Sequence, residues 1–368
     1  MNKKIIVIFI IISAFLLSGS YSETIQKQLD IAENSGLSDI LSKETIDFLE
    51  RIGIENISYE KLTSLNFKDV FIILSESISA KIKEPFMAIF SITACAIICS
   101  VIDNFYKNSS QSGQIINAVA TLSVCSIFIF PIKKVLESSS AVIEECSDFM
   151  LGFVPIYSSA IIASGNFNSA IGFRTLMLNT VTIISRISGE IITPLICICL
   201  AMCLAASVFN INIGEISKSI KNFAVWMLTF SATIFSGILG FGTLISSTGD
   251  IAFSKTAKLF IGTAVPIVGG TVSDALSTLK SCLEVTKNVL GTYAIVVIAA
   301  IFLPSVISLL SWKISLSISS GIGDILGNKN FSAILSSASS VMGIMLALVV
   351  ITAVMFIFAV GIMLKIGG

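Results

Sequence analysis

Six long, uninterrupted apolar runs limit this chain to folds in which helices cross a lipid bilayer. They cover residues 85–102, 115–132, 191–209, 223–245, 292–310 and 341–364. A run of about 18 residues at 1.5 Å per residue is close to the ~30 Å thickness of a hydrocarbon core. Hydrophobic residues make up 54% of the chain and charged residues only 12%, against about 25% charge in soluble domains. The sequence predicts an all-α polytopic membrane protein with about six to eight transmembrane helices.

For three further hydrophobic segments, the sequence does not decide whether they cross the membrane. Residues 149–163 and 259–272 are short for a membrane span, and a proline interrupts each of them, Pro155 and Pro266. Proline removes a backbone donor and clashes with the preceding turn, so we expect two proline-broken segments. Unwound backbone at membrane depth is tolerated only where protein buries it or where it lines a wet cavity. A packing kink in a helix bundle is an equally weighted alternative. The third segment, 170–185, carries Arg174 and is interpreted as a crossing or an interfacial helix.

The two proline segments echo each other. Val154-Pro155-Ile156 recurs as Val265-Pro266-Ile267, and Pro194, Gly214 and Lys221-Asn222-Phe223 are matched in order by Pro304, Gly323 and Lys329-Asn330-Phe331. The offset drifts from 111 through 110 and 109 to 108 residues, which predicts an internal duplication; the alternative is chance similarity in a biased composition. We expect a first transmembrane hairpin over 85–147, membrane repeat 1 over 148–257 and membrane repeat 2 over 258–368.

Corresponding interrupted segments in two halves are the pattern found around transporter binding sites. Charged residues within membrane segments are costly and are functional candidates by default. The predicted conduit or broken-helix residues are Gly152, Pro155, Gly165, Arg174, Gly262, Pro266, Gly269, Gly270 and Asp274.

The N-terminal part of the chain has the features of a signal peptide followed by an exported segment, not of further membrane spans. Lys3 and Lys4, the apolar stretch 5–17 and Ser18-Gly19-Ser20 are typical of a signal peptide over residues 1–20, with an uncleaved anchor as the alternative. Residues 21–84 are predicted to be an exported acidic helical segment. Within it, Gly53 is a plausible helix stop and Asn66 a plausible cap.

Catalytic chemistry is not predicted. The chain has no histidine, which excludes Ser-His-Asp and Cys-His triads, histidine zinc sites and histidine proton relays. It also lacks a phosphate-binding loop with the G-x-x-x-x-G-K-[ST] pattern. Two cysteine pairs share a helix face at four-residue spacing, Cys95/Cys99 and Cys199/Cys203, and packing is favoured over metal binding for both. Arg186 and Glu190 are four residues apart on one helix face and could neutralise each other, so a structural pair is favoured over a relay. We expect no catalytic residue, cofactor or metal.

Two stretches at the echoed motifs resemble the stage III sporulation protein AE family of endospore-forming bacteria. They are the run from Phe153 to Gly165 (FVPIYSSAIIASG) and, more specifically, the run from Lys255 to Ala275 (KTAKLFIGTAVPIVGGTVSDA). The order of signal peptide, short exported segment and polytopic remainder agrees as well, so the resemblance covers essentially the whole chain.

The resemblance implies a subunit of the channel complex that links mother cell and forespore and is needed for late forespore development. Its partners would be other proteins of the same operon, including a secretion-type ATPase and ring-forming subunits, together with a forespore channel protein. The protein would lie in the mother-cell-derived outer forespore membrane, with its N-terminal segment in the intermembrane space. Two other functions stay open, a self-contained permease for ions or small metabolites and a membrane scaffold without transport activity.

Overall fold

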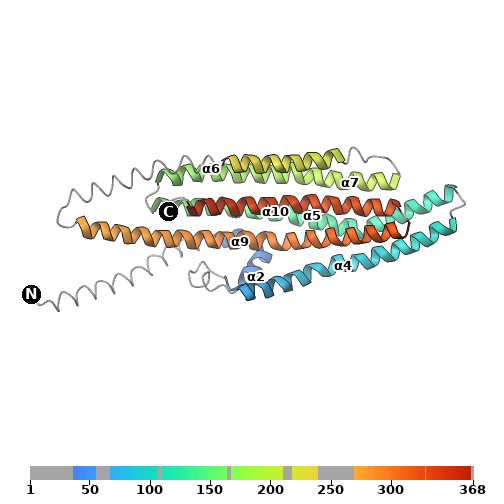
Figure 1. Cartoon of the computed structure of the whole chain (residues 1–368), viewed down its shortest axis with the longest axis horizontal. Coiled ribbons are helices and arrows are strands. Elements are labelled where there is room, and N and C mark those ends of the chain that lie inside the picture. Colours follow the sequence, from blue (N-terminus) through green and yellow to red (C-terminus); the bar gives the residue numbers. More distant parts are fainter. Residues whose placement is uncertain are drawn as a thin grey trace, which may run out of the picture.

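The protein is an elongated bundle of long helices (Figure 1). The structure, a computed structural model, describes residues 36–54, 67–106, 110–163, 167–209, 218–238, 269–327 and 329–365. All regular structure in these residues is helical, which confirms the predicted all-α class. The elements are η1 (Ser38–Ile40), α2 (Lys43–Arg51), α4 (Phe67–Tyr106), α5 (Ser110–Ala163), α6 (Phe167–Arg186), η2 (Ile187–Ile192), α7 (Thr193–Phe209), a helix over 218–238, α9 (Gly269–Ile325) and α10 (Lys329–Lys365).

The short helix α2 has well-formed ends. The Ser42 side chain caps its first turn by accepting a hydrogen bond from the Thr45 N–H. At the other end Gly53 has a φ of +81°, and the Ile54 N–H donates to the Leu49 carbonyl at 2.9 Å. This left-handed glycine turn satisfies carbonyls that the helix end leaves free. The helix stop predicted at Gly53 is confirmed.

The long helices exceed the thickness of a bilayer. Helices α4, α5, α9 and α10 contain 40, 54, 57 and 37 residues, which correspond to about 55–85 Å at 1.5 Å per residue. Within the described residues, three stretches are long and apolar enough to cross a membrane, Ser169–Met202, Asn288–Ile325 and Phe331–Leu364. The last two contain the predicted runs 292–310 and 341–364. The runs 85–102 and 115–132 fall on α4 and α5, and the described part of the run 223–245 falls on the helix over 218–238. All three stay predictions as membrane spans.

Residues 170–185 and 191–209, predicted as separate segments, belong to one continuous helical rod. The π-helical stretch η2 joins α6 to α7. The backbone N–H and the Oγ1 of Thr193 both reach the Ser188 carbonyl, the latter at 2.9 Å. A π turn inserts one extra residue, and here it lies immediately before Pro194. The wider turn lets the rod continue into α7 although Pro194 supplies no N–H.

Helices α9 and α10 form an antiparallel hairpin with a serine-rich interface. Ser317 and Ser339 hydroxyls are hydrogen-bonded at 2.8 Å, and those of Ser320 and Ser332 at 3.0 Å. The Phe331 ring packs against Gly323 where the helices meet. Figure 1 shows that the rod α6–η2–α7 and the following helix form a second pair of opposed helices. Lys221 and Lys329 both lie near the start of a returning helix. These positions agree with the predicted duplication, which stays a prediction.

Two contacts fix how the first hairpin lies along α9. The buried Ser305 hydroxyl donates to the Ser139 hydroxyl at 2.8 Å, and the Ser100 hydroxyl donates to the Leu326 carbonyl at 3.1 Å. In Figure 1, α5 runs opposite to α9 and α4 runs with it. The apolar run 85–102 therefore lies beside the C-terminal third of α9 and not beside 292–310. The apolar sections of the bundle are staggered along its axis.

Candidate functional site

The structure separates the residues predicted to form a conduit. Gly152 and Pro155 lie on α5 and Arg174 lies on α6, where its side chain is exposed. Gly269 and Gly270 begin α9, and Asp274 follows in its first turns. Gly165, Gly262 and Pro266 lie outside the described residues. Residues 259–268 of the second proline segment, including Pro266, therefore lie outside the described residues, and only its end from Gly269 is described.

The first segment is not broken at Pro155. Helix α5 continues without interruption through Pro131 and Pro155 to Ala163, so the expectation of a proline-broken segment there is wrong. Val154, Tyr157 and Ile161 are buried around the proline. The buried apolar face on both sides keeps the helix in place, because unwinding it would expose those side chains and further backbone groups.

Gly152 has a packing role that the sequence did not reveal. A Cβ atom built on Gly152 would lie 3.1 Å from both Ile40 Cδ1 and Leu37 Cδ2. Leu37 is buried, with 2% of its surface exposed. The missing side chain lets the segment 36–54 lie directly against α5.

The predicted neutralisation of Arg186 by Glu190 is also wrong. Both residues are described and exposed, and among the described ion pairs none joins them. Glu190 lies within the π-helical stretch, while Arg186 ends α6. The wider π turn rotates residues four apart away from a common face, and this removes the geometry on which an i,i+4 pair depends.

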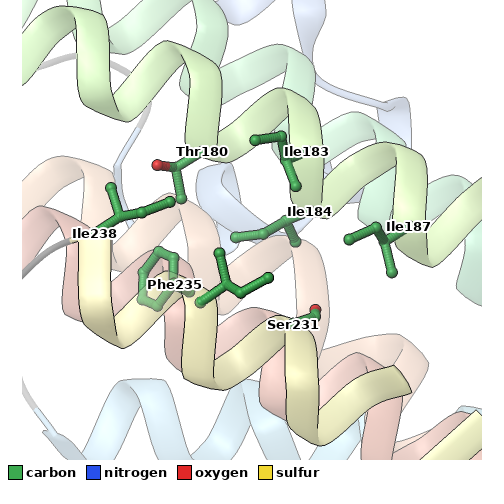
Figure 2. Close-up of a pocket in the computed structure, with 8 residues that line it drawn as sticks. Thr180, Ile183, Ile184, Ile187, Ser231, Phe235 and Ile238 are labelled. Carbon is green, nitrogen blue, oxygen red and sulfur yellow. The ribbon is translucent and has the colours of Figure 1, made fainter. Parts of the chain in front are cut away.

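A shallow apolar pocket lies between α6 and the helix over 218–238 (Figure 2). Its volume is about 230 Å³ including space open to the outside, and it is lined by Thr180, Ile183, Ile184, Ile187, Ser231, Ile234, Phe235 and Ile238. The Thr180 hydroxyl already donates to the Leu176 carbonyl at 2.6 Å. None of the predicted site residues lines this pocket. Its chemistry suits hydrocarbon and offers a polar solute no charged partner.

A charged surface on α5 is the more informative site. We define the α5 charged face as Lys133, Lys134, Glu137, Glu144 and Asp148, all of which are exposed. At 100° per residue, four of them fall within an arc of about 60°, and Lys134 lies beside this arc. Lys133 and Glu137 form an ion pair at 3.4 Å, with 67% and 65% of their side chains exposed.

The α5 charged face lies level with the middle of the candidate span Asn288–Ile325. Ser139 is buried on the opposite side of α5, between Glu137 and Glu144 in sequence, and contacts Ser305, which lies near the middle of the candidate span Asn288–Ile325. Lys133 and Asp148 are six and nine residues from Ser139, or about 9 and 14 Å along the helix. For a bilayer centred at the level of Ser305, both distances are within the half-thickness of about 15 Å of a hydrocarbon core.

Charges at this depth need water or protein around them. A single charged side chain at the bilayer centre costs about 2.5–3.5 kcal/mol on insertion scales, so such residues face the bundle interior or a water-filled cavity. The α5 charged face is directed out of the chain's own core. The sequence has charges at positions 133, 137, 144 and 148, a spacing that places them on one face of a helix. This face could be recognised only once the segments on either side were known to belong to the single helix α5.

A second polar element lies at the same level. The Glu145 carboxylate accepts hydrogen bonds from the Ser42 N–H and the Thr45 hydroxyl through Oε1, both at 2.8 Å. A carboxylate at a helix N-terminus is stabilised by the free N–H groups and the helix dipole. Lys81 on α4 adds an ion pair to Glu44 at 2.6 Å. Helix α2, with Asp47 exposed and paired to Arg51 on its outer side, is thus held beside the apolar spans.

These features together define a helical membrane protein. In the described residues, three helical stretches are long and apolar enough to cross a bilayer, and large apolar side chains such as Phe90, Phe130, Trp226 and Phe358 are exposed on the outside of the bundle. In the described part of the chain no group of three or more Cys, Asp or Glu side chains is placed to hold a metal.

Comparison with known proteins identifies the family. The family described as "Stage III sporulation protein AE (spore_III_AE)" matches residues 54–367, and the chain belongs to this family. The resemblance read from the sequence is confirmed. The stage III sporulation protein AE of Bacillus subtilis (strain 168) is 20% identical over 211 residues, which are 57% of this chain and 53% of that protein. The chain thus matches about half the length of this curated relative. No solved structure matches.

Proposed function

We propose that the protein is an integral membrane subunit of the channel complex between mother cell and forespore and that it forms part of the conduit. Its family is a family of sporulation proteins. The observation that supports a conduit is the α5 charged face, level with the middle of the apolar hairpin α9–α10. Charged residues at this depth are typical of solute and ion pathways.

The proposal also covers the partners of the protein and the membrane in which it lies. Its partners are other proteins of the same operon, among them a secretion-type ATPase and ring-forming subunits, and a forespore channel protein. It lies in the outer forespore membrane, with its N-terminal segment exposed to the intermembrane space and α2 reaching from there to the level of Glu145. The contact of Glu145 with α2 supports placing the adjoining part of α5 on the side of the N-terminal segment. The chain itself carries no catalytic role.

The test separates a conduit from a scaffold. Glu144→Leu with Asp148→Leu removes two exposed charges of the α5 charged face and should block late forespore development while the complex still assembles. Asp324→Leu is the matched control, because Asp324 is equally exposed but lies at the end of α9. Development is scored by forespore reporter expression and assembly by pull-down of the tagged protein. Loss of assembly together with development would favour the scaffold, and normal development would count against the conduit.

Pro266→Leu and Gly270→Leu test the segment that the sequence predicts as part of the conduit. A block in development with intact assembly is expected for both. Purified protein in liposomes that moves solutes without any partner would instead favour a self-contained permease.

A further inference from the structure

We infer that a water molecule binds between α4 and α9 and joins the hydroxyl groups of Thr93, Ser315 and Ser319. The site is separate from the α5 charged face and does not depend on the proposed function. Its three oxygen atoms come from two helices that are more than 200 residues apart in the sequence.

Three buried hydroxyl oxygens make no hydrogen bond within the protein. They are Oγ1 of Thr93 on α4 and Oγ of Ser315 and Ser319 on α9. Both serines expose only 1% of their surface. A buried polar group without a partner loses the hydrogen bonds that water gives it in the unfolded chain, and lipid offers none in return. Native structures rarely leave such groups unpaired, and an unpaired group indicates a bound water or ion.

The three hydroxyls face one another across a single helix interface. The Ser100 hydroxyl donates to the Leu326 carbonyl at 3.1 Å, and α4 packs along α9 and runs in the same direction (Figure 1). Counting seven residues back along both helices brings Thr93 level with Ser319. Seven residues are about two helical turns, so each residue keeps the face of its helix that makes the first contact. Ser315 lies one further turn back on the same face of α9.

Other serines of α9 show the bonds that Ser315 and Ser319 lack. On the side of α10, Ser317 and Ser320 bond directly to serine hydroxyls of α10 at 2.8 and 3.0 Å. Ser311, one turn before Ser315, donates to the carbonyl four residues earlier in its own helix at 2.8 Å. Ser315 and Ser319 make neither kind of bond. The α4–α9 interface thus holds polar groups that stop short of direct pairing.

Water suits these groups better than an ion does. A hydroxyl can both donate and accept a hydrogen bond, and a buried water needs two to four polar partners. A cation would give up its hydration without meeting a negative charge, because the three side chains are neutral. The bound water adds a third polar contact between the first hairpin and α9, beside those of Ser100 and Ser139.

A double-mutant cycle tests the bridge. Thr93→Val and Ser319→Ala each remove one hydroxyl, and reversible unfolding of the full chain in bicelles gives the unfolding equilibrium constant. Each change should raise this constant by about 2- to 10-fold, and the double variant should show less than the product of the two factors, because one water serves both groups. A lower constant for each variant would show that the hydroxyls are dry and unpaired, and effects that simply multiply would show that each pairs within its own helix. Either result would overturn the inference.

Ser311→Ala is the matched control, because its hydroxyl is already bonded within α9 on the same side of the helix. Its effect should multiply with that of Thr93→Val. Coupling as strong as that of Ser319→Ala would show a general change of the interface and would count against a specific bridge.

A density map of the full chain in nanodiscs, at a resolution that shows ordered water, locates the molecule directly. The expected result is a peak within hydrogen-bond distance of the Thr93 hydroxyl and of at least one of the two serine hydroxyls. Direct contact between Thr93 and Ser319, with no peak between them, would overturn the inference even if the cycle shows coupling.

Discussion

The Ser305 hydroxyl donates a hydrogen bond to the Ser139 hydroxyl across 166 residues of sequence, at 2.8 Å in a buried interface. Ser305 belongs to a helix that can cross a membrane, whereas Ser139 lies between the charged positions 133 and 148 of α5. This contact places a charged section at the depth of an apolar one. The proposed conduit depends on it.

We expect Ser139 and Ser305 to be energetically coupled. Hydrogen bonds between helices in membranes average about 0.6 kcal/mol in double-mutant cycles, with a maximum of about 1.7 kcal/mol. The single changes Ser139→Ala and Ser305→Ala should each destabilise the protein, and the double variant should lose less than the sum by an amount in this range. Reversible unfolding in bicelles measures the free energies. Strict additivity would show that the two hydroxyls do not interact.

Glu145→Ala should release helix α2 from α5. The carboxylate is the acceptor for the Ser42 N–H and the Thr45 hydroxyl, and the loss of two such bonds costs about 1–3 kcal/mol. Faster proteolysis between residues 36 and 54 is the expected readout. Glu145→Gln keeps an acceptor oxygen and should restore part of the protection.

The control for this change is the neighbouring Glu144→Ala. Glu144 is exposed and on a different side of α5, so its variant should retain the proteolysis rate of the unmodified protein. A rate as high as that of Glu145→Ala would show that general weakening of α5, and not loss of the cap, causes release.

Gly152→Val should displace the N-terminal segment from α5. A Cβ atom at 152 already approaches Leu37 and Ile40 to 3.1 Å, and the two further methyl groups have no room without movement. Gly172→Val is the matched control, because nothing lies within 4 Å of a Cβ atom there. Proteolysis of residues 36–54 should accelerate only for the first variant. Equal rates would mean that the segment adapts to the larger side chain.

Gly323→Ala and Gly321→Ala should change stability in opposite directions. A Cβ atom at 323 would lie 2.5 Å from Phe331 Cδ1 and 3.4 Å from the Ser332 nitrogen, whereas a Cβ atom at 321 meets nothing within 4 Å. The first change should destabilise the α9–α10 hairpin by about 1–3 kcal/mol through overpacking. The second should stabilise it by about 0.5–1 kcal/mol, because alanine favours the helix. Thermal unfolding in detergent compares the two, and a common sign would contradict the close packing at Phe331.

The sequence by itself determined the class of protein and several local features. Apolar runs near bilayer length and a low charge content require membrane-spanning helices, because lipid leaves backbone groups no other partners. The runs 292–310 and 341–364 lie in candidate spans, and the turn at Gly53 follows from the freedom of glycine to adopt positive φ. These properties depend on a few neighbouring residues and on the solvent.

The tertiary structure decided which segments form continuous helices and at which level of the bundle the α5 charged face lies. Helix α5 passes through Pro155 although the local rule predicts a break, because packing against neighbours outweighs one missing hydrogen bond. The π turn at η2 joins two predicted segments into one. The depth of the α5 charged face follows from a hydrogen bond between residues 139 and 305. Contacts between distant residues set how far one helix slides along another, and no local sequence pattern specifies that distance.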